Sequence, residues 1–556
     1  MAHYDAWWTA PRRARDCSRR DVDRLVEQVF AAPEHQSVAL IGAHAVKAVM
    51  VSTAAGPPAI TWGAPARAQA LHVAREVRPT RQASSSHWIR TAALALTALL
   101  VSNCGATSAP NPLASRLLSA ATLPSGWTAT TAKQDSIVAN QSPCFAGMPE
   151  HPKGFDYRVA IFVQGSAVPN LSEVVASGPS AGSVWSDLDR TLSSCHSATL
   201  AIAGKKVKTA ISPLALPSLG ASSSAYAWRF TFSGMGFGTD MVLFESGKYV
   251  GYLAYSDLGS PSTAVVTAFA KAALAKIEGH PVGRIPGNLT ITSAPMRTAH
   301  TSLGKVAYRE IGSGPPLVMI TGYGGTMTSW DRRFVDALAS THRVVIFDNA
   351  GIGGTQGLSR PLTIDEMANQ TSALITSLGL RGTDVLGWSM GSMIAQALAV
   401  LHPAQVRRLV LCAPYPGTGA AVPPSRKTLN EFESGNPQEA LSFLFPADQS
   451  AASTAYQVAI SSYPPAATAS AQVLSEQGRA VDQWWAGKNA AGLQTGVIRV
   501  PTLIADGTLD KLDPLANSRA TATLIPGSTL LLYPDAGHAF LFQEKGFVSR
   551  VDAFLG

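Results

Sequence analysis

Charged residues, aromatic residues and cysteines are all scarce in this sequence. Charged residues make up 14% of its 556 residues and aromatic residues 7%, and there are 5 cysteines. Long acidic or basic tracts are absent and 46% of the residues are hydrophobic, which excludes a chain that stays disordered for want of a core. Long apolar runs are absent as well, which excludes a polytopic membrane protein. The 47 Gly and 36 Pro then indicate globular domains with many turns.

The net basic charge is also small over most of the chain. The net charge is +8, and residues 1–104 carry 12 Lys and Arg against 7 Asp and Glu. The other 452 residues therefore have a net charge of only +3. They show no stripe of Lys or Arg and no RNA-binding signature, so the sequence argues against a nucleic acid as partner.

The length predicts at least two domains, because a single core seldom exceeds ~250–300 residues. The segments that we expect are a doubtful or unstructured extension over 1–85, a signal over 86–104, an exported domain over 105–280, a linker over 281–290 and a second domain over 291–556. Within 105–280, short β-rich runs alternate with expected helices near 181–194 and 262–277. This alternation is typical of a small α+β domain.

The segment 91–102, TAALALTALLVS, is apolar and follows Arg90. As a helix it would span ~18 Å, less than the ~30 Å of a bilayer core. A basic flank, a short apolar run and a small-residue exit are features of a secretory signal. The last four residues, Val-Ser-Asn-Cys, resemble the lipobox of bacterial lipoproteins, although asparagine replaces the usual Gly, Ala or Ser. The resemblance implies a lipid-modified Cys104 that anchors the mature protein to a membrane; a short buried helix with an incidental cysteine is the alternative.

Signal sequences normally begin within the first few residues, yet about ninety residues precede this run. One hypothesis is therefore that translation starts downstream, for example at Val77. Cys144 and Cys195 both follow the signal, where oxidation is allowed, and we expect a disulfide between them. Closing a loop of about fifty residues would stabilise the domain by ~4 kcal/mol in the chain-entropy model. Cys412, in the apolar run LVLCAP, is expected to be a buried small hydrophobic residue.

Residues 291–556 show a different pattern, in which short apolar runs alternate with helix-length intervals. The runs are VAYREIG, PLVMITG, RVVIFD, DVLGWS, RRLVLCAP, PTLIADG and TLLLYPDAG. They predict an α/β fold with a doubly wound, mostly parallel sheet covered on both faces. Residues 417–495 separate two of the runs, and so long an excursion predicts a helical cap. Its aromatic residues are candidates for pocket walls, although packing onto the sheet explains each equally well; they are Phe443, Phe445, Trp484 and Trp485.

Two G-x-S-x-G motifs occur, at 178–182 and 387–391. Either match alone is weak, because a chain rich in Gly and Ser contains one by chance about as often as not. The chemistry needs the serine on a sharp turn between a strand and a helix, with its hydroxyl exposed. Ser389 follows the strand-like run DVLGW and precedes the helical pattern SMIAQALAVL. Ser180 follows a proline in a Ser/Gly/Pro-rich loop, so we expect Ser389 to be the nucleophile and Ser180 to be structural.

A serine nucleophile needs a base that takes up its proton. In hydrolases with this serine turn the base follows the serine in the sequence, and only His402 and His538 follow Ser389. His402 would end the helix after the serine, ~20 Å away along its axis. His538, just past the apolar run TLLLY, is therefore the expected base.

The acid that orients the imidazole is expected at Asp510. Asp510 lies far enough past the strand-like run TLIA to turn back over the sheet. Asp506 and Asp513 stay open as alternatives, and Asp535 is the remaining nearby carboxylate.

The segments PLVMITGYGG, FDNAGIGGT, GWSMGSM, PTLIADGTLD and DAGHAF resemble the successive motifs of the α/β-hydrolase fold, in their usual order, over about 270 residues. The resemblance places the turn 322–324 where the family has its His-Gly oxyanion turn, with Thr321 replacing the histidine. It implies an oxyanion hole formed by the backbone N–H groups of Tyr323 and Met390, each donor worth ~3–4 kcal/mol in the transition state. A serine nucleophile excludes the epoxide-hydrolase and dehalogenase branches, which use a carboxylate.

The sequence thus predicts an exported, lipid-anchored serine hydrolase that cleaves an ester or related carbonyl bond, in a small molecule or a lipid, through an acyl-enzyme. Esterase, lactonase, C–C hydrolase and perhydrolase activities all stay open. No metal or organic cofactor is implied, because the triad and the oxyanion hole supply all the groups. The alternative is an envelope-binding or sensor lipoprotein with a secondary or vestigial hydrolase domain, in which residues 105–280 perform the recognition.

Overall fold

The structure is a computed structural model, and it describes residues 39–43, 46–51, 59–62, 112–130, 154–165, 168–202, 205–217, 219, 222–358, 361–433 and 437–556. The chain divides into two units, Met1–Ser84 and Ser85–Gly556. In the first unit, the strands β1 (Ala39–Ala43), β2 (Val46–Val51) and β3 (Ala59–Trp62) pair antiparallel in that order. The signal segment 86–104 with Cys104 lies outside the described residues, and so does Cys144. Among the helices that are described, none is both long and apolar enough to cross a membrane.

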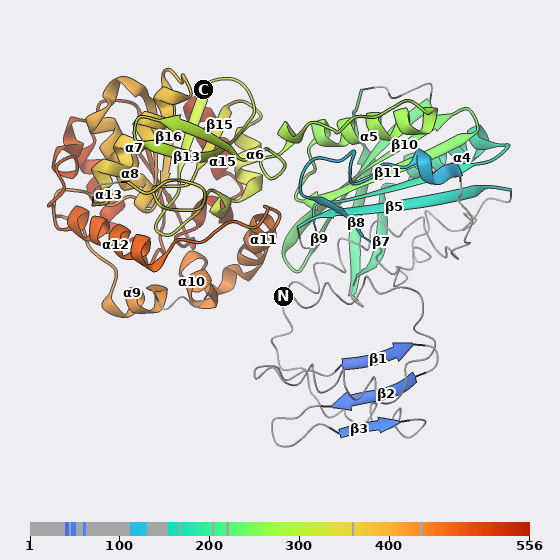
Figure 1. The fold of residues 1–556 in the computed structure, drawn as a ribbon, viewed down its shortest axis with the longest axis horizontal. Coiled ribbons are helices and arrows are strands. Elements are labelled where there is room, and N and C mark those ends of the chain that lie inside the picture. The colour runs from blue at the N-terminus through green and yellow to red at the C-terminus, as the bar shows by residue number, and fades with distance from the viewer. Residues whose placement is uncertain are drawn as a thin grey trace. The chain divides into compact units, whose positions relative to one another are not determined.

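An eight-stranded antiparallel sheet with two helices occupies the part of the second unit up to residue 278 (Figure 1). Its strands in spatial order are β4 (Trp127–Ala129), β5 (Asp156–Gln164), β6 (Asn170–Ser177), β11 (Tyr249–Leu258), β10 (Met235–Ser246), β9 (Ser222–Phe232), β8 (Lys205–Pro213) and β7 (Ser197–Ile202). The helices are α4 (Ala181–Ser194) and α5 (Thr263–Glu278), and a 3-10 helix, η3 (Pro112–Arg116), precedes β4.

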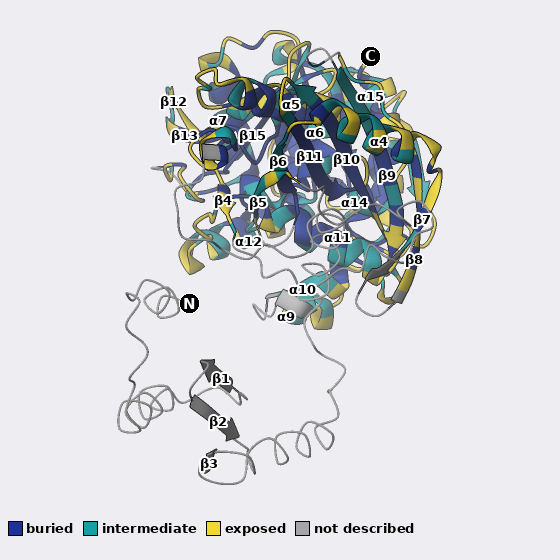
Figure 2. Ribbon diagram, turned by 90° about the vertical axis from the view of Figure 1, so that its right-hand side faces the viewer, coloured by how far each residue is buried: buried dark blue, intermediate teal, exposed yellow. Residues whose placement is uncertain are grey.

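The two faces of this sheet have separate cores, because successive side chains on a strand point to opposite faces. Val242 and Phe244 of β10 pack in one core with the apolar side of α5. Met241 and Leu243 of the same strand belong to the other core, which includes Leu192 of α4. Figure 2 shows β10 and β11 as the buried centre of the sheet.

A second eight-stranded sheet follows in residues 297–533. Its strands in spatial order are β12 (Arg297–Thr301), β13 (Gly304–Ile311), β15 (Arg343–Phe347), β14 (Pro316–Ile320), β16 (Thr383–Trp388), β17 (Val406–Cys412), β18 (Thr502–Gly507) and β19 (Thr529–Tyr533). From β15 to β19 all neighbours are parallel, whereas β12 and β13 pair antiparallel at one edge. The prediction of a mostly parallel, doubly wound sheet is confirmed.

Helices cover both faces of this sheet, which explains why its strands are continuous apolar runs. Every residue of β16 and of β18 is buried. One face packs against α7 (Ile364–Ser377) and α8 (Met390–Leu401), and the other against α6 (Arg332–Leu338), α14 (Phe540–Gln543) and α15 (Phe547–Leu555). A further helix, α13 (Ala516–Leu524), lies between β18 and β19 in the sequence. Parallel strands bring their carboxyl ends to one edge, where the loops after β14, β16, β18 and β19 meet.

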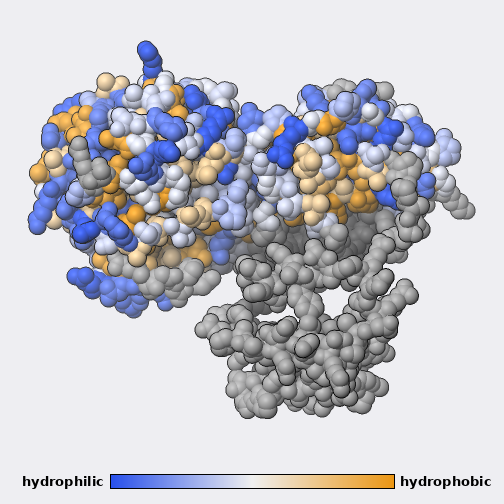
Figure 3. All heavy atoms as spheres, viewed as in Figure 1, coloured by the Kyte–Doolittle hydropathy of each residue, from blue (hydrophilic) through white to orange (hydrophobic). Residues whose placement is uncertain are grey.

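Four helices fill the interval between β17 and β18, and we call residues 417–495 the cap. They are α9 (Arg426–Glu433), α10 (Pro437–Leu444), α11 (Ser450–Ser461) and α12 (Ala471–Trp485), and the 3-10 helix η10 (Gly492–Val497) leads on toward β18. On the face shown in Figure 3, hydrophilic and hydrophobic side chains intermix.

Candidate active site

Ser389 stands on a strained turn between β16 and α8. Its backbone has φ 59° and ψ −125°, a conformation that L-residues with side chains rarely adopt. The turn is closely packed, because a Cβ on Gly391 would lie 2.1 Å from the carbonyl oxygen of Ile320 and one on Gly387 would lie 2.2 Å from that of Gly391. Glycine is therefore required at both positions around the serine. Ser389 is thereby held at the amino end of a helix, at the carboxyl edge of the sheet.

His538 and Asp510 are joined by a hydrogen bond of 2.6 Å between His538 Nδ1 and Asp510 Oδ2. Both are buried, with 3% and 8% of their surface exposed. The other carboxylate oxygen, Asp510 Oδ1, accepts from the backbone N–H groups of Leu512 and Asp513 at 2.8 and 2.7 Å. Three donors therefore fix the orientation of this carboxylate. The structure thus brings together the histidine and the aspartate that the sequence favoured.

The alternative aspartates have other partners. Asp506 accepts from the Gly507 N–H and the Ser518 hydroxyl, and Asp513 accepts from the Asn517 side-chain amide. Burial, and next the charge of Asp510, raises the pKa of Asp506 well above its usual value. Burial, and next the charges of Asp506 and Asp510, does the same to the pKa of Asp513. Of the three carboxylates, Asp510 is the one that is bonded to His538, which favours it as the acid.

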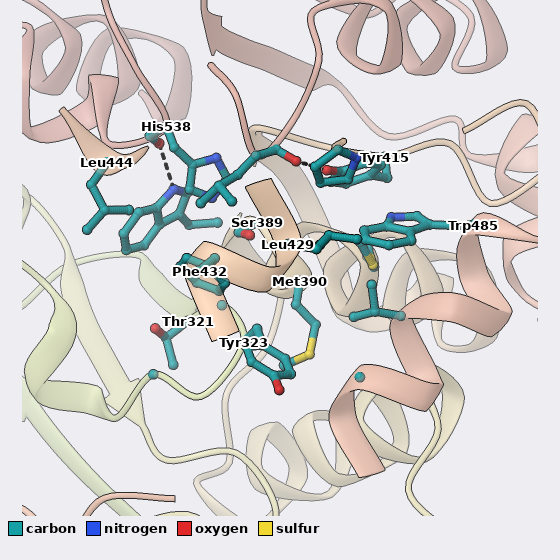
Figure 4. A pocket seen from close by; sticks show the side chains of 18 of the residues that line it. Thr321, Tyr323, Ser389, Met390, Tyr415, Leu429, Phe432, Leu444, Trp485 and His538 are labelled. Carbon is teal, nitrogen blue, oxygen red and sulfur yellow. Dashed lines mark hydrogen bonds between the residues drawn. The ribbon is translucent and has the colours of Figure 1, made fainter. Parts of the chain in front are cut away.

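The turn after β14 packs directly against Ser389. A Cβ on Gly322 would lie 3.0 Å from Cβ of Ser389, so the backbone of this turn can approach the serine only because the residue is glycine. The Gly324 N–H donates to Gln477 Oε1 of α12 at 2.8 Å, which ties the turn to the cap. In the view of Figure 4 the side chains of Tyr323 and Met390 lie on the same side of Ser389, and the oxyanion hole formed by their backbone N–H groups stays a prediction.

A cavity of about 410 Å³ opens at Ser389, between the sheet edge and the cap. Ser389, His538, Tyr323, Met390 and Thr321 all line it. Ser389 lies near its centre in Figure 4, with His538 on one side. Its volume is in the range of sites for small organic ligands.

The C-terminal part of this chain is similar to known proteins. A family model for the alpha/beta hydrolase fold matches residues 315–545. The putative non-heme bromoperoxidase BpoC of Mycobacterium tuberculosis is 29% identical over 272 residues, which cover 44% of this chain and 94% of that protein. The putative carbamate hydrolase RutD of Caulobacter sp. is 30% identical over 264 residues, which cover 45% of this chain and 95% of that protein. This chain belongs to the α/β-hydrolase fold family.

Among solved structures, an alpha/beta hydrolase fold protein from Chitinophaga pinensis has 28% identity and a TM-score of 0.42, covering 48% of this chain and 98% of that chain. In this α/β-hydrolase, Ser389, Asp510 and His538 occur in the sequence in the order serine, aspartate, histidine, which is the order of the catalytic triad in the fold family.

The walls of the cavity in this α/β-hydrolase differ in part from the candidates taken from the cap sequence. Trp485 lines the cavity, but Trp484 is fully buried and its indole N–H donates to the Tyr415 carbonyl at 3.0 Å. Phe443 and Phe445 are buried and pack on other rings of the cap, Phe432 and Tyr456 respectively. Those three candidates are therefore packing residues of the cap and do not line this cavity.

Several wall residues were missed from the sequence. Leu429 and Phe432 of α9 line the cavity, and so do Met393 of α8 and Tyr415 after β17. The spacing of Leu429 and Phe432, three residues apart in a polar helix, was the available signal, since such residues share one helix face. Figure 4 shows Leu429, Phe432 and Tyr415 beside the serine.

The remaining singled-out residues lie away from this site. Ser180 also lies between a strand and a helix, β6 and α4, but its backbone φ is −124°, unlike the 59° of Ser389, and its side chain makes no cap hydrogen bond. His402 Nε2 is paired with Asn369 Oδ1 at 2.8 Å. Cys412 is a buried free thiol, as expected, and burial raises its pKa. Cys195 is buried after α4, and its disulfide with Cys144 stays a prediction. Within the described part of the chain, no group of three or more His, Cys, Asp or Glu side chains could hold a metal ion.

Proposed function

We propose that residues 291–556 act as a serine hydrolase, with Ser389 as the nucleophile, His538 as the base and Asp510 as the acid. The observation that carries the proposal is the 2.6 Å bond between His538 and Asp510, made beside the cavity that Ser389 also lines. With Nδ1 engaged by the carboxylate, Nε2 is the imidazole nitrogen left to accept a proton from the serine.

The reaction proceeds in two halves. Ser389 Oγ attacks the substrate carbonyl while His538 Nε2 takes the serine proton, and the tetrahedral intermediate carries its negative charge on the former carbonyl oxygen. The backbone N–H groups of Tyr323 and Met390 are the proposed donors to that oxygen. The intermediate expels the alcohol, which receives the proton from His538, and leaves an acyl-enzyme. Water, deprotonated by His538, then releases the acid and restores the serine.

The proposed substrate is a small-molecule or lipid ester, or a related carbonyl compound. The cavity supports this choice, because aliphatic and aromatic side chains such as Leu429, Phe432 and Trp485 line it together with the polar triad. The Caulobacter relative, named a putative carbamate hydrolase, supports attack on a carbonyl with an oxygen or nitrogen leaving group.

Export and membrane attachment are part of the proposal. They rest on the apolar segment 91–102 and on Cys104, whose lipid-modified form would anchor the mature protein. Incorporation of a radiolabelled fatty acid into the protein in its host, and its loss in Cys104→Ser, tests this part by itself.

The test of the hydrolase is labelling of the full chain by a serine-reactive fluorophosphonate, with the adduct mapped by mass spectrometry. We expect label on Ser389 and none in Ser389→Ala or His538→Ala. Ser180→Ala is the matched control, because it removes the serine of the other G-x-S-x-G motif and is expected to label normally. Folded wild-type protein that stays unlabelled would overturn the proposal.

A further inference from the structure

Trp388 precedes the proposed nucleophile in the chain and contacts the proposed base. It is the last residue of β16, immediately before Ser389, and it is 6% exposed. Its ring lines the cavity, and its centroid lies 5.6 Å from that of the His538 ring, with 35° between the ring planes. In the sequence, Trp388 is the last residue of the strand-like run DVLGW.

The indole of Trp388 also makes a directed contact with the base. Its Nε1–H donates to the backbone carbonyl oxygen of His538 at 3.0 Å, and both groups are buried (Figure 4, dashed line at His538). A buried carbonyl without a donor costs ~1–3 kcal/mol, so this bond favours one position of the His538 backbone. Asp510 holds Nδ1 of the ring from the other side.

The loop that carries His538 has little regular structure of its own. Residues 534–539 form turns between β19 and α14, and a regular ladder does not fix the His538 backbone. The neighbouring Ala539 N–H donates to the carbonyl of Leu444, in the cap, at 2.9 Å. The bond from Trp388 therefore ties this loop to the strand that ends at the nucleophile.

Trp388 is in turn held rigidly. The Phe542 ring packs edge-on against it at 5.2 Å and 80°. A side chain locked in this way transmits the position of β16 to the histidine loop.

We propose that Trp388 is a positioning residue for the base: its indole N–H and ring fix the His538 backbone and imidazole at the distance from Ser389 that proton transfer requires. This inference rests on the proposed function, since it assigns Trp388 a role in the same reaction. It predicts that loss of the indole N–H lowers the rate of the chemical steps more than substrate binding, because the contact reaches the base and leaves most of the cavity wall intact.

The test compares Trp388→Phe with Trp330→Phe in the full chain, on a p-nitrophenyl ester and a fluorophosphonate. Trp330 is the matched control, because it is fully buried in the same aromatic cluster and its indole nitrogen has no hydrogen-bond partner within the described residues. We expect Trp388→Phe to lower kcat and the labelling rate by ~10- to 100-fold, the effect of a displacement of about 1 Å in a catalytic group, with KM changed less than about threefold. Trp330→Phe is expected to stay within about threefold of the wild type in kcat.

A second variant guards against misfolding. Replacing Trp388 by β-(3-benzothienyl)alanine keeps a ring system of nearly the same shape and exchanges the N–H for sulfur. If this variant shows the same fall in kcat as Trp388→Phe and an unchanged thermal stability, the result supports the role of the hydrogen bond. Full activity in either Trp388 variant would overturn the inference and leave the proposed function intact. An equal loss in Trp330→Phe would overturn it too, since it would indicate general core packing. Wild-type protein that neither labels nor hydrolyses would overturn both proposals.

Discussion

Replacing Asp510 by asparagine should remove nearly all hydrolase activity while leaving the fold and substrate binding in place. In the wild type, Oδ1 of Asp510 accepts from two backbone N–H groups and Oδ2 faces His538 Nδ1. An asparagine has one oxygen, and turning its NH₂ toward the two N–H groups would leave donors facing donors, at ~1–3 kcal/mol for each lost bond. The asparagine oxygen therefore stays on the backbone side.

This substitution changes the tautomer of His538. The asparagine NH₂ then faces Nδ1, which must become an acceptor, so that the ring proton sits on Nε2 and the ring cannot take up the serine proton. In a serine protease the same change lowers kcat by ~10⁴, which corresponds to about 5.5 kcal/mol of transition-state stabilisation. We expect a loss of this order for Asp510→Asn in kcat, with KM changed only a few fold.

The assay is steady-state hydrolysis of a p-nitrophenyl ester by the full chain, with thermal unfolding as the check on folding. Asp506→Asn and Asp513→Asn are the matched controls, because both carboxyls are buried near Asp510 but have the side chains of Ser518 and Asn517, respectively, as partners in place of His538. Both should retain kcat within about tenfold. If Asp510→Asn keeps a tenth or more of the activity while one of the control variants loses it, the assignment of the acid is wrong.

Three further predictions concern stability. Burial raises the pKa of Glu173 to about 8, so this carboxyl ionises at a lower pH in the unfolded protein than in the folded one. The free energy of unfolding should therefore fall, by up to a few kcal/mol, as pH rises from about 4.5 to 8. Urea unfolding at several pH values should show a smaller fall in Glu173→Gln. Gly391→Ala places a Cβ 2.1 Å from a backbone carbonyl oxygen of β14. This variant should lower the free energy of unfolding by ~1–3 kcal/mol or more and slow fluorophosphonate labelling. Gly546→Ala is the control, because its Cβ would have no atom within 4 Å, and it should do neither. Arg332→Met leaves the buried Asp257 carboxylate without its ion-pair partner and should lower the free energy of unfolding, measured with urea, by ~3–5 kcal/mol. Adding Asp257→Asn should lower it by a smaller further amount. Strictly additive changes in the free energy of unfolding would show that the two residues are not coupled.

The sheet, and with it the edge at which the candidate triad residues lie, was predictable from the sequence because local pattern determines it. A parallel strand covered on both faces contains a continuous apolar run, and β14, β16, β17 and β18 each contain one, although β16, β17 and β18 also carry charged residues. The carboxyl ends of such strands meet at one edge, so Ser389 and the loop with His538 were expected to converge there. The assignment of Asp510 over Asp506 depended only on loop length, and the hydrogen bond at 2.6 Å now supports it.

The walls of the cavity were not predictable in the same way. Trp484 and Trp485 are neighbours on α12, and adjacent helical side chains point about 100° apart, so the two tryptophans have different surroundings. Which one faces the cavity depends on how the helix sits on the core, where Trp484 finds the Tyr415 carbonyl as its partner. A contact between residues 69 positions apart leaves no mark in the local sequence pattern. The same holds for the hydrogen bond that joins Trp388 to His538 across 150 positions.

Helix α11 contacts both the antiparallel sheet and the cavity. Ala455 and Val458 on this cap helix pack in the core that includes β9 and β10, and the Ser462 hydroxyl after the helix donates to the Val168 carbonyl, next to β6, at 3.0 Å. Tyr456, between those two apolar residues in sequence, instead lines the cavity. Since close-packed interiors transmit displacement, the position of this cavity wall depends on the sheet as well as on the hydrolase core. A chain reduced to residues 291–556 would expose the apolar side of α11 and lose one support of its own active site, so the N-terminal sheet contributes to the hydrolase even if it binds nothing.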